Sequence, residues 1–131
     1  MKKPSKKYIW EKYVSPYIRQ RDANFSGYCR CISCNKVRPW KEMDAGHFIR
    51  KSKGNSVYFL EDNIHAQCTD CNRFGSMETG HQYGENLKKK IGEKRFKELY
   101  EIAKDSYQMG AEELNTVKDH YKQKLDSVDK L

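Results

Sequence analysis

Hydrophobic residues recur at helical spacing near both ends of the chain, whereas the segment between them has short and irregular patterns. The first helical run consists of Tyr8, Ile9, Trp10, Tyr13, Val14, Tyr17 and Ile18. Pro16 lies within this run. It predicts either one kinked helix or two helices, the second capped by Ser15, with an end near residues 22–24. We expect the aromatic side chains to form core rather than a platform for stacked bases.

The middle of the chain, residues 25–80, has no long periodic pattern. We predict brief β segments near residues 28–32, 45–49 and 57–60, and an exposed loop at residues 52–56. A short helix is predicted to begin around residues 69–71, after the second cysteine pair.

After Gly80 the pattern becomes helical again, with a short segment at residues 85–91 and then two apolar stripes separated by Met109-Gly110. The first stripe consists of Phe96, Leu99, Tyr100, Ala103 and Tyr107, and the second of Leu114, Val117, Tyr121, Leu125 and Val128. The second stripe is narrow and flanked by charges. It therefore predicts a helix that packs loosely or supports self-association.

Composition places the chain among small globular proteins. Its 131 residues are 37% hydrophobic and 34% charged, which predicts one domain with a modest core. Within it we distinguish a basic helical arm (1–24), a central core (25–80) and a helical C-terminal extension (81–131). No signal-like segment opens the chain and no stretch approaches membrane-spanning length, so we expect an intracellular protein without a membrane partner.

The basic excess is unevenly placed. The formal net charge is +8, and residues 1–50 alone carry 12 Lys and Arg against 4 Asp and Glu, while the remainder has no formal net charge. A phosphate-rich partner such as nucleic acid would explain this distribution. A solvated basic face that only maintains solubility would explain it equally well.

Two Cys-x-x-Cys pairs, Cys31/Cys34 and Cys68/Cys71, enclose 33 residues. Each pair forms a tight turn that directs two sulfurs at one ion, and four thiolates suit the tetrahedral Zn²⁺ of a structural site. The spacing exceeds that of a compact zinc ribbon, so we expect a functional insert between the turns. The fifth cysteine, Cys29, does not have this spacing and is predicted to be a buried or idle thiol.

The insert and the residue after the second pair carry groups suited to phosphodiester hydrolysis. Asp44 and His47 lie close together on a predicted β segment, and a histidine can take a proton from water near neutral pH. Asn72 directly follows Cys71, and its carbonyl oxygen is a hard ligand suited to Mg²⁺. Such an ion would stabilise the charge that develops on a reacting phosphate.

The order Cys31-x-x-Cys34, His47, Asn63, Cys68-x-x-Cys71-Asn72 resembles the zinc-supported HNH, or His-Me finger, nuclease motif. Residues 43–48 and 63–74 are more closely similar to the phage NinG (Rap) recombination proteins, a likeness that covers about residues 8–100. The resemblance implies an α+β fold with a small zinc-bound, treble-clef-like ββα-metal core between N-terminal and C-terminal helices. It also implies an endonuclease for Holliday junctions and D-loops, in the cytoplasm of a bacterium or a phage-infected host cell.

For the matching positions of this chain, the resemblance implies that His47 is the general base and that Asn72 is a ligand of catalytic Mg²⁺ or Mn²⁺. Asn63 would orient His47, or the loop after it, through hydrogen bonds. Many HNH sites have a metal ligand directly before the base, where this chain has Gly46. A β-bulge at Ala45-Gly46 would bring Asp44 to the metal instead; the alternative is that Asp44 is only a turn residue.

Several further roles follow from this hypothesis. His65 either faces the site and contacts phosphate or is structural. Two symmetric cuts in a junction favour a homodimer, for which the last helix is the simplest interface.

The rival functions are a non-catalytic zinc-stabilised nucleic-acid-binding module and an HNH nuclease that acts on linear DNA. The residues predicted to bind DNA phosphates, with a solvated-loop alternative for the lysines, are Arg19, Arg21, Arg50, Lys51, Lys53 and Arg73.

Overall fold

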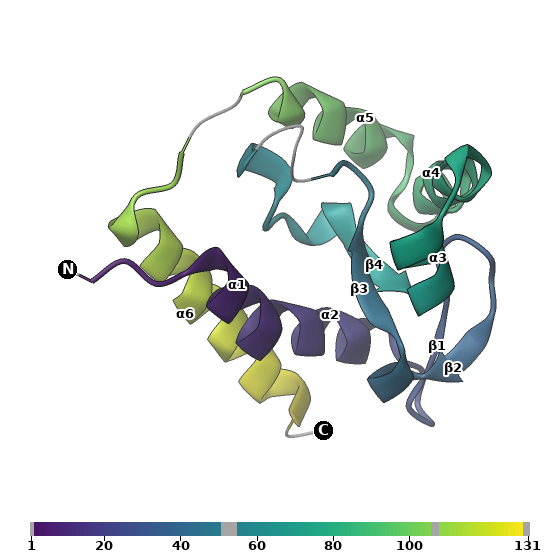
Figure 1. The fold of residues 1–131 in the computed structure, drawn as a ribbon, viewed down its shortest axis with the longest axis horizontal. Coiled ribbons are helices and arrows are strands. Elements are labelled where there is room, and N and C mark those ends of the chain that lie inside the picture. The colour runs from purple at the N-terminus through teal and green to yellow at the C-terminus, as the bar shows by residue number, and fades with distance from the viewer. Residues whose placement is uncertain (1, 51–54, 106–107, 130–131) are drawn as a thin grey trace.

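A computed structural model describes residues 2–50, 55–105 and 108–129 of the chain. They form a mixed α+β domain with two small antiparallel sheets and helices on either side (Figure 1). The elements in chain order are α1 (Lys6–Ile9), α2 (Ser15–Asp22), β1 (Tyr28–Arg30), β2 (Val37–Pro39), β3 (Asp44–His47), β4 (Ile64–Gln67), α3 (Thr69–Phe74), α4 (Met77–Ile91), α5 (Glu93–Ala103) and α6 (Ala111–Asp129).

The N-terminal helix begins earlier than predicted and does not break at Pro16. Ser5 caps it by accepting a hydrogen bond from the Tyr8 amide. A π-helical turn at Trp10–Val14 joins α1 to α2, and Ser15 has helical dihedral angles, so the predicted N-cap at Ser15 is wrong. The amide of Ser15 donates to the Trp10 carbonyl five residues earlier. This wider turn lets the chain pass Pro16, which has no N–H and would crowd a regular helix.

The two sheets are hairpins. Strand β1 pairs with β2, which the sequence pattern did not predict, and β3 pairs with β4 in a continuous register from Asp44↔Gln67 to His47↔Ile64. The predicted strand at residues 57–60 is wrong. Residues Asn55–Val57 form a 3₁₀ turn, and the apolar side chains of Val57, Tyr58 and Phe59 are buried in irregular structure. A short apolar run indicates burial without determining the backbone conformation.

The β3–β4 hairpin lies between two helical layers (Figure 1). On one side, α2 packs against it and α6 packs against α2, with Ile18, Ile64 and Leu114 fully buried in one cluster. On the other side, α4 and α5 supply Leu87 and Leu99 to a second cluster. The predicted core role is confirmed for most of the N-terminal run. Tyr8 remains exposed and Trp10 is only partly buried.

The C-terminal helices largely match the sequence pattern, although α4 begins at Met77, well before the predicted residue 85. A reciprocal capping box between Ser76 and Thr79 fixes this start. In α6, Leu114 and Tyr121 are buried, so the stripe packs within the chain rather than loosely. Tyr107 of the first stripe lies outside the described residues. Among the described residues, no helix combines the length and apolar character that a membrane crossing requires.

Candidate functional site

Four cysteine sulfurs meet where the two hairpins adjoin. The Sγ atoms of Cys31, Cys34, Cys68 and Cys71 all lie within 4.8 Å of one another. Cys34 and Cys68 are 3.8 Å apart at sulfur. A tetrahedral ion with Zn–S bonds of about 2.3 Å requires sulfurs separated by roughly this distance. All five cysteines are free thiols, so the cluster could hold a structural metal such as zinc.

Backbone contacts bring the two cysteine turns together. The amide of Ile32, inside the first turn, donates to the Ala66 carbonyl of β4 at 3.0 Å. Asn35 has a positive φ of 65°, which closes the first turn. The fifth thiol, Cys29, is fully buried as predicted and donates to the Arg19 carbonyl at 3.1 Å. Burial raises the pKa of Cys29 to about 11.

The imidazole of His47, at the end of β3, is held on three sides. Its Nε2 lies 2.8 Å from the carbonyl oxygen of Tyr58, which can only accept, so Nε2 carries the proton. The ring stacks on the indole of Trp10 with centroids 4.5 Å apart and packs at a tilt against the Tyr58 ring at 4.7 Å. In the neutral ring the lone pair is therefore on Nδ1, which makes the side chain chemically suited to accept a proton.

Asp44 and Asn72 contact each other directly. The amide nitrogen of Asn72 donates to Asp44 at 3.0 Å, and Arg73 and Thr69 also contact this carboxylate, at 3.2 and 3.4 Å. The register is continuous through Ala45 and Gly46, so the expected β-bulge is wrong. The start of α3 against β3 makes the contact without one.

Gly46 faces the Asn72 amide. A Cβ at Gly46 would lie 2.0 Å from Gln67 Oε1 and 3.1 Å from Asn72 Oδ1. A side chain at this position would therefore displace the carboxamide of Gln67 and crowd that of Asn72.

Asn63 is fully buried and binds the loop that follows His47. Its side chain accepts from the Ile49 amide at 2.8 Å and donates to the carbonyls of Ile49 and Val57 at 2.9 and 3.0 Å. Val57 directly precedes Tyr58, whose carbonyl holds His47. Asn63 thus fixes the backbone on which the imidazole depends.

His47 and Asn72 line one open cleft of about 800 Å³. Cys71 of the sulfur cluster also lines it. Three cationic residues contribute to its wall, Lys6, Lys7 and Arg50, and none of the described residues that line it is acidic. An anionic ligand would meet a favourable electrostatic field in this cleft.

Sequence reasoning did not predict the contributions of Lys6, Trp10 and Tyr58. Lys6 and Trp10 are four residues apart and share one face of the N-terminal helix, a spacing that could have revealed them. The ammonium of Lys6 lies 5.7 Å from the Tyr58 ring centroid. Tyr58 gave no signal in the sequence, because its carbonyl and its ring both meet His47 only in the folded chain.

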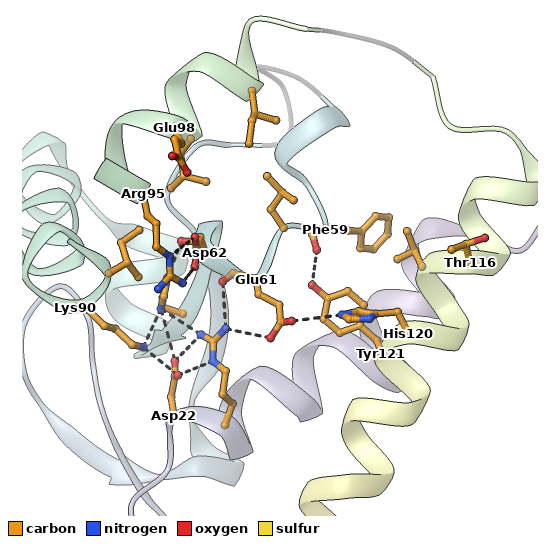
Figure 2. A pocket seen from close by; sticks show the side chains of 17 residues that line it. Asp22, Phe59, Glu61, Asp62, Lys90, Arg95, Glu98, Thr116, His120 and Tyr121 are labelled. Carbon is orange, nitrogen blue, oxygen red and sulfur yellow. Dashed lines mark hydrogen bonds and ion pairs between the residues drawn. The ribbon is translucent and has the colours of Figure 1, made fainter. Parts of the chain in front are cut away.

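His65 does not line this cleft. It lies in a second cavity of about 850 Å³, between α2, α4, α5 and α6, whose ion pairs Figure 2 shows. His65 is 2% exposed; its Nε2 donates to the Asp62 carbonyl at 2.7 Å, and its Nδ1 lies 2.8 Å from the Lys90 ammonium. These contacts favour the structural interpretation of His65.

The charges of the second cavity are paired with one another. Asp22 contacts Arg21 and Lys90, each at 2.9 Å, Glu61 contacts His120 at 3.4 Å, and Arg95 pairs with Asp62 (Figure 2). The positive and negative side chains of this cavity therefore compensate one another.

The buried members of this network have shifted pKa values. Burial alone would raise the pKa of Asp22, but Arg21, Lys90 and the Ala66 amide outweigh it and lower the pKa to about 2. Burial, followed by the positive charges of Lys90 and Arg21, lowers the pKa of His65 to about 3. Asp22 is therefore charged and His65 neutral at physiological pH.

The arginines predicted to bind DNA have different positions. Arg21 does not project into solvent; it is partly buried and donates to the carbonyls of Ile64 and Glu61, at 2.7 and 3.1 Å. Arg19 is partly buried against Trp40, and burial lowers its pKa. Arg50 lines the cleft and Arg73 is exposed beside Asp44. The predicted Lys51 and Lys53 lie outside the described residues.

Residues 2–130 match the family described as Bacteriophage Lambda NinG protein. Over 115 residues the chain is 31% identical to protein ninG of Escherichia phage lambda and to protein ninG of Salmonella phage P22. Each alignment covers 88% of this chain and 53% of the relative, so the chain spans about half the length of the curated relatives it matches. No solved structure matches the chain significantly.

Proposed function

Since this chain belongs to the NinG family, we propose that it is a metal-dependent, structure-specific DNA endonuclease of the HNH, or His-Me finger, type. Its proposed substrates are branched recombination intermediates such as Holliday junctions and D-loops. One observation carries the proposal. His47 and Asn72, from β3 and α3, line one cleft whose charged walls are basic.

The β3–β4 hairpin and α3 form the proposed ββα core. Cys68 is the N-cap of α3 and Cys71 lies in its first turn, so zinc bound to the four sulfurs would fix the helix against the hairpin. Asn72 directly follows Cys71, which couples the position of its amide to the structural metal.

His47 is the proposed general base. The hydrogen bond from Nε2 to the Tyr58 carbonyl fixes the tautomer in which Nδ1 accepts a proton. Nδ1 takes a proton from water, and the water oxygen then attacks phosphorus. The bond between phosphorus and the 3′ oxygen breaks, leaving a 5′-phosphate and a 3′-hydroxyl whose proton comes from solvent.

A catalytic Mg²⁺ or Mn²⁺ would bind the oxygens of Asp44 and Asn72. These side chains touch at 3.0 Å and supply a carboxylate and an amide carbonyl, the hard donors that such ions prefer. The bound ion would supply charge stabilisation at the phosphate and the leaving oxygen. It would also replace the positive charge of Arg73, which now contacts the Asp44 carboxylate at 3.2 Å.

Lys6, Lys7, Arg50 and Arg73 are proposed to hold the DNA backbone around the cleft, with salt-dependent affinity and little base reading. Lys51 and Lys53 follow Arg50 in sequence and remain in the proposed set. Arg19 and Arg21 do not, because their side chains are partly buried and donate to main-chain carbonyls. A homodimer would deliver paired cuts through a surface other than the apolar stripe of α6.

The decisive experiment compares wild type, His47→Ala and the exposed-residue control His81→Ala on a four-way junction and a linear duplex, with and without Mg²⁺. We expect wild type and the control to cut the junction only with metal, and His47→Ala to bind it without cutting. Binding without cleavage in any divalent metal would instead show a nucleic-acid-binding module. Preferred cleavage of linear DNA would show an HNH nuclease of another specificity.

A further inference from the structure

Two large apolar side chains are exposed to solvent beside the cleft that His47 and Asn72 line. Phe74, the last residue of α3, is 79% exposed and Met77, the first of α4, is 94% exposed. The residues between them, Gly75 and Ser76, line the cleft, as do Asn72 before them and Thr79 after them. The pair therefore borders the position proposed for the scissile phosphate.

The turn that presents this pair has a defined conformation. A Cβ at Gly75 would lie 2.3 Å from the Cys71 carbonyl oxygen and 2.6 Å from Thr79 Oγ1, so the backbone is closely packed there. The amide of Ser76 donates to Thr79 Oγ1 at 2.7 Å, and the Thr79 amide donates back to Ser76 Oγ at 3.4 Å. Phe74 and Met77 thus project from a turn that is tied to the cysteine cluster through Cys71.

We propose that Phe74 and Met77 contact unstacked bases at the branch point of the DNA substrate, an inference that rests on the proposed nuclease function. The bases of a continuous duplex cover one another, whereas those at a branch point can expose an apolar face. Phe and Met are side chains that proteins insert between or against such bases. The basic residues Arg50, Lys6 and Lys7 of the cleft and Arg73 beside the pair favour a nucleic acid as the occupant, despite the acidic Glu78 next to Met77.

This contact would account for a preference that phosphate binding cannot provide. Lys and Arg side chains hold the phosphates of branched and linear DNA alike. Two apolar side chains that can contact the face of a base only where the bases are unstacked would favour branched DNA. They would also place the branch point next to Asn72 and the cleft.

The test uses His47→Ala protein, so that DNA is bound but not consumed, and adds Phe74→Ala together with Met77→Ala. Anisotropy titrations measure affinity for a four-way junction and for a linear duplex, and 2-aminopurine at the branch point reports unstacking. We expect junction affinity to fall about tenfold or more, because base–aromatic contacts contribute at this level. Duplex affinity should change less than about twofold, and the 2-aminopurine signal should disappear.

Phe25→Ala in the same background is the matched control, since Phe25 is also an exposed apolar residue but neither it nor its neighbours in the chain line the cleft. It should bind both DNAs like the parent, and Phe74→Trp should retain the junction preference.

Unchanged junction affinity and an unchanged 2-aminopurine signal in the double variant would overturn the inference. So would a loss of self-association in sedimentation with equal loss for both DNAs, which would identify a contact between protein copies. If the parent binds no DNA at all, the proposed function fails as well; if wild type cuts junctions, only the present inference is at stake.

Discussion

The indole of Trp10 lies nearly parallel to the imidazole of His47, with an interplanar angle of 22° and a centroid distance of 4.5 Å. Trp10 begins the π-helical turn of the N-terminal helix, and His47 ends β3, 37 positions later in the sequence. The contact connects the basic N-terminal helix to the proposed general base. We assign Trp10 a positioning role in this arrangement, because its indole stacks on the proposed base.

Replacing Trp10 with Ala should slow cleavage without weakening DNA binding. The imidazole would lose the ring that stacks on it, and small misplacement of a catalytic group is costly. We expect kcat to fall about tenfold or more while KM stays within about twofold, and Trp10→Phe to recover most of the rate. Tyr8→Ala, an exposed aromatic on the same helix, is the control for single-turnover measurements. A parallel rise in KM would assign Trp10 to substrate binding instead.

Replacing Asp44 with Asn should make cleavage depend more steeply on Mg²⁺. Asn retains an oxygen that can accept from Asn72 and Thr69, but it removes the charge that attracts the ion. At limiting Mg²⁺ the rate should fall about 10- to 100-fold and recover in part at high Mg²⁺. Arg73→Ala is the companion variant, since it removes the cation on this carboxylate and should lower the Mg²⁺ requirement. Equal rates for Asp44→Asn and wild type at every Mg²⁺ concentration would leave Asp44 only a structural role at the start of β3.

Cys68→Ser should lose the structural metal, whereas Cys29→Ser should keep it. Of these two cysteines, only Cys68 belongs to the four-sulfur cluster; the Cys29 thiol instead donates a hydrogen bond to the Arg19 carbonyl. Because a structural zinc site contributes folding free energy, Cys68→Ser and chelator-treated wild type should both melt at lower temperature. Elemental analysis should find one zinc ion per chain in wild type and Cys29→Ser. Wild type purified without bound metal and unaffected by chelator would contradict this prediction.

His65 should make stability decline as the pH falls from neutrality. Its pKa is about 3 in the folded protein and about 6.5 when exposed, so the unfolded chain binds the additional proton between these values. The free energy of unfolding should therefore fall below pH 6.5, by up to about 1.4 kcal/mol per pH unit. Asp22, whose pKa is lowered to about 2, reduces the free energy of unfolding further only below about pH 4.

Urea denaturation at pH 7, 6 and 5 measures how the free energy of unfolding depends on pH. His65→Gln should have a flatter dependence than wild type, and the exposed control His81→Gln should match wild type. Protonation of the cysteine thiolates affects all three proteins equally and cancels in the comparison. A slope unchanged by His65→Gln would mean that His65 is protonated in the folded protein.

Some features of this protein follow from local sequence. The two Cys-x-x-Cys turns, the helix that begins at Thr69 and the separation of α5 from α6 near Met109 were predictable, because residues a few positions apart determine them. The π-helical turn before Pro16 is a local effect too, yet the same proline is compatible with a break. The choice depended on burial of Ile9, Val14 and Ile18 against β4 and α6.

Tertiary contacts decided the rest. Arg21 and Asp22 look like surface residues of a basic helix, but their partners Glu61, Ala66 and Lys90 lie about 40 or more positions further along the chain. His65 became structural, and Trp10 became part of the cleft, through similarly remote contacts. Sequence periodicity reports which face of an element is buried. It carries no information on which distant groups meet there, and those neighbours set the charge state, orientation and chemistry of each side chain.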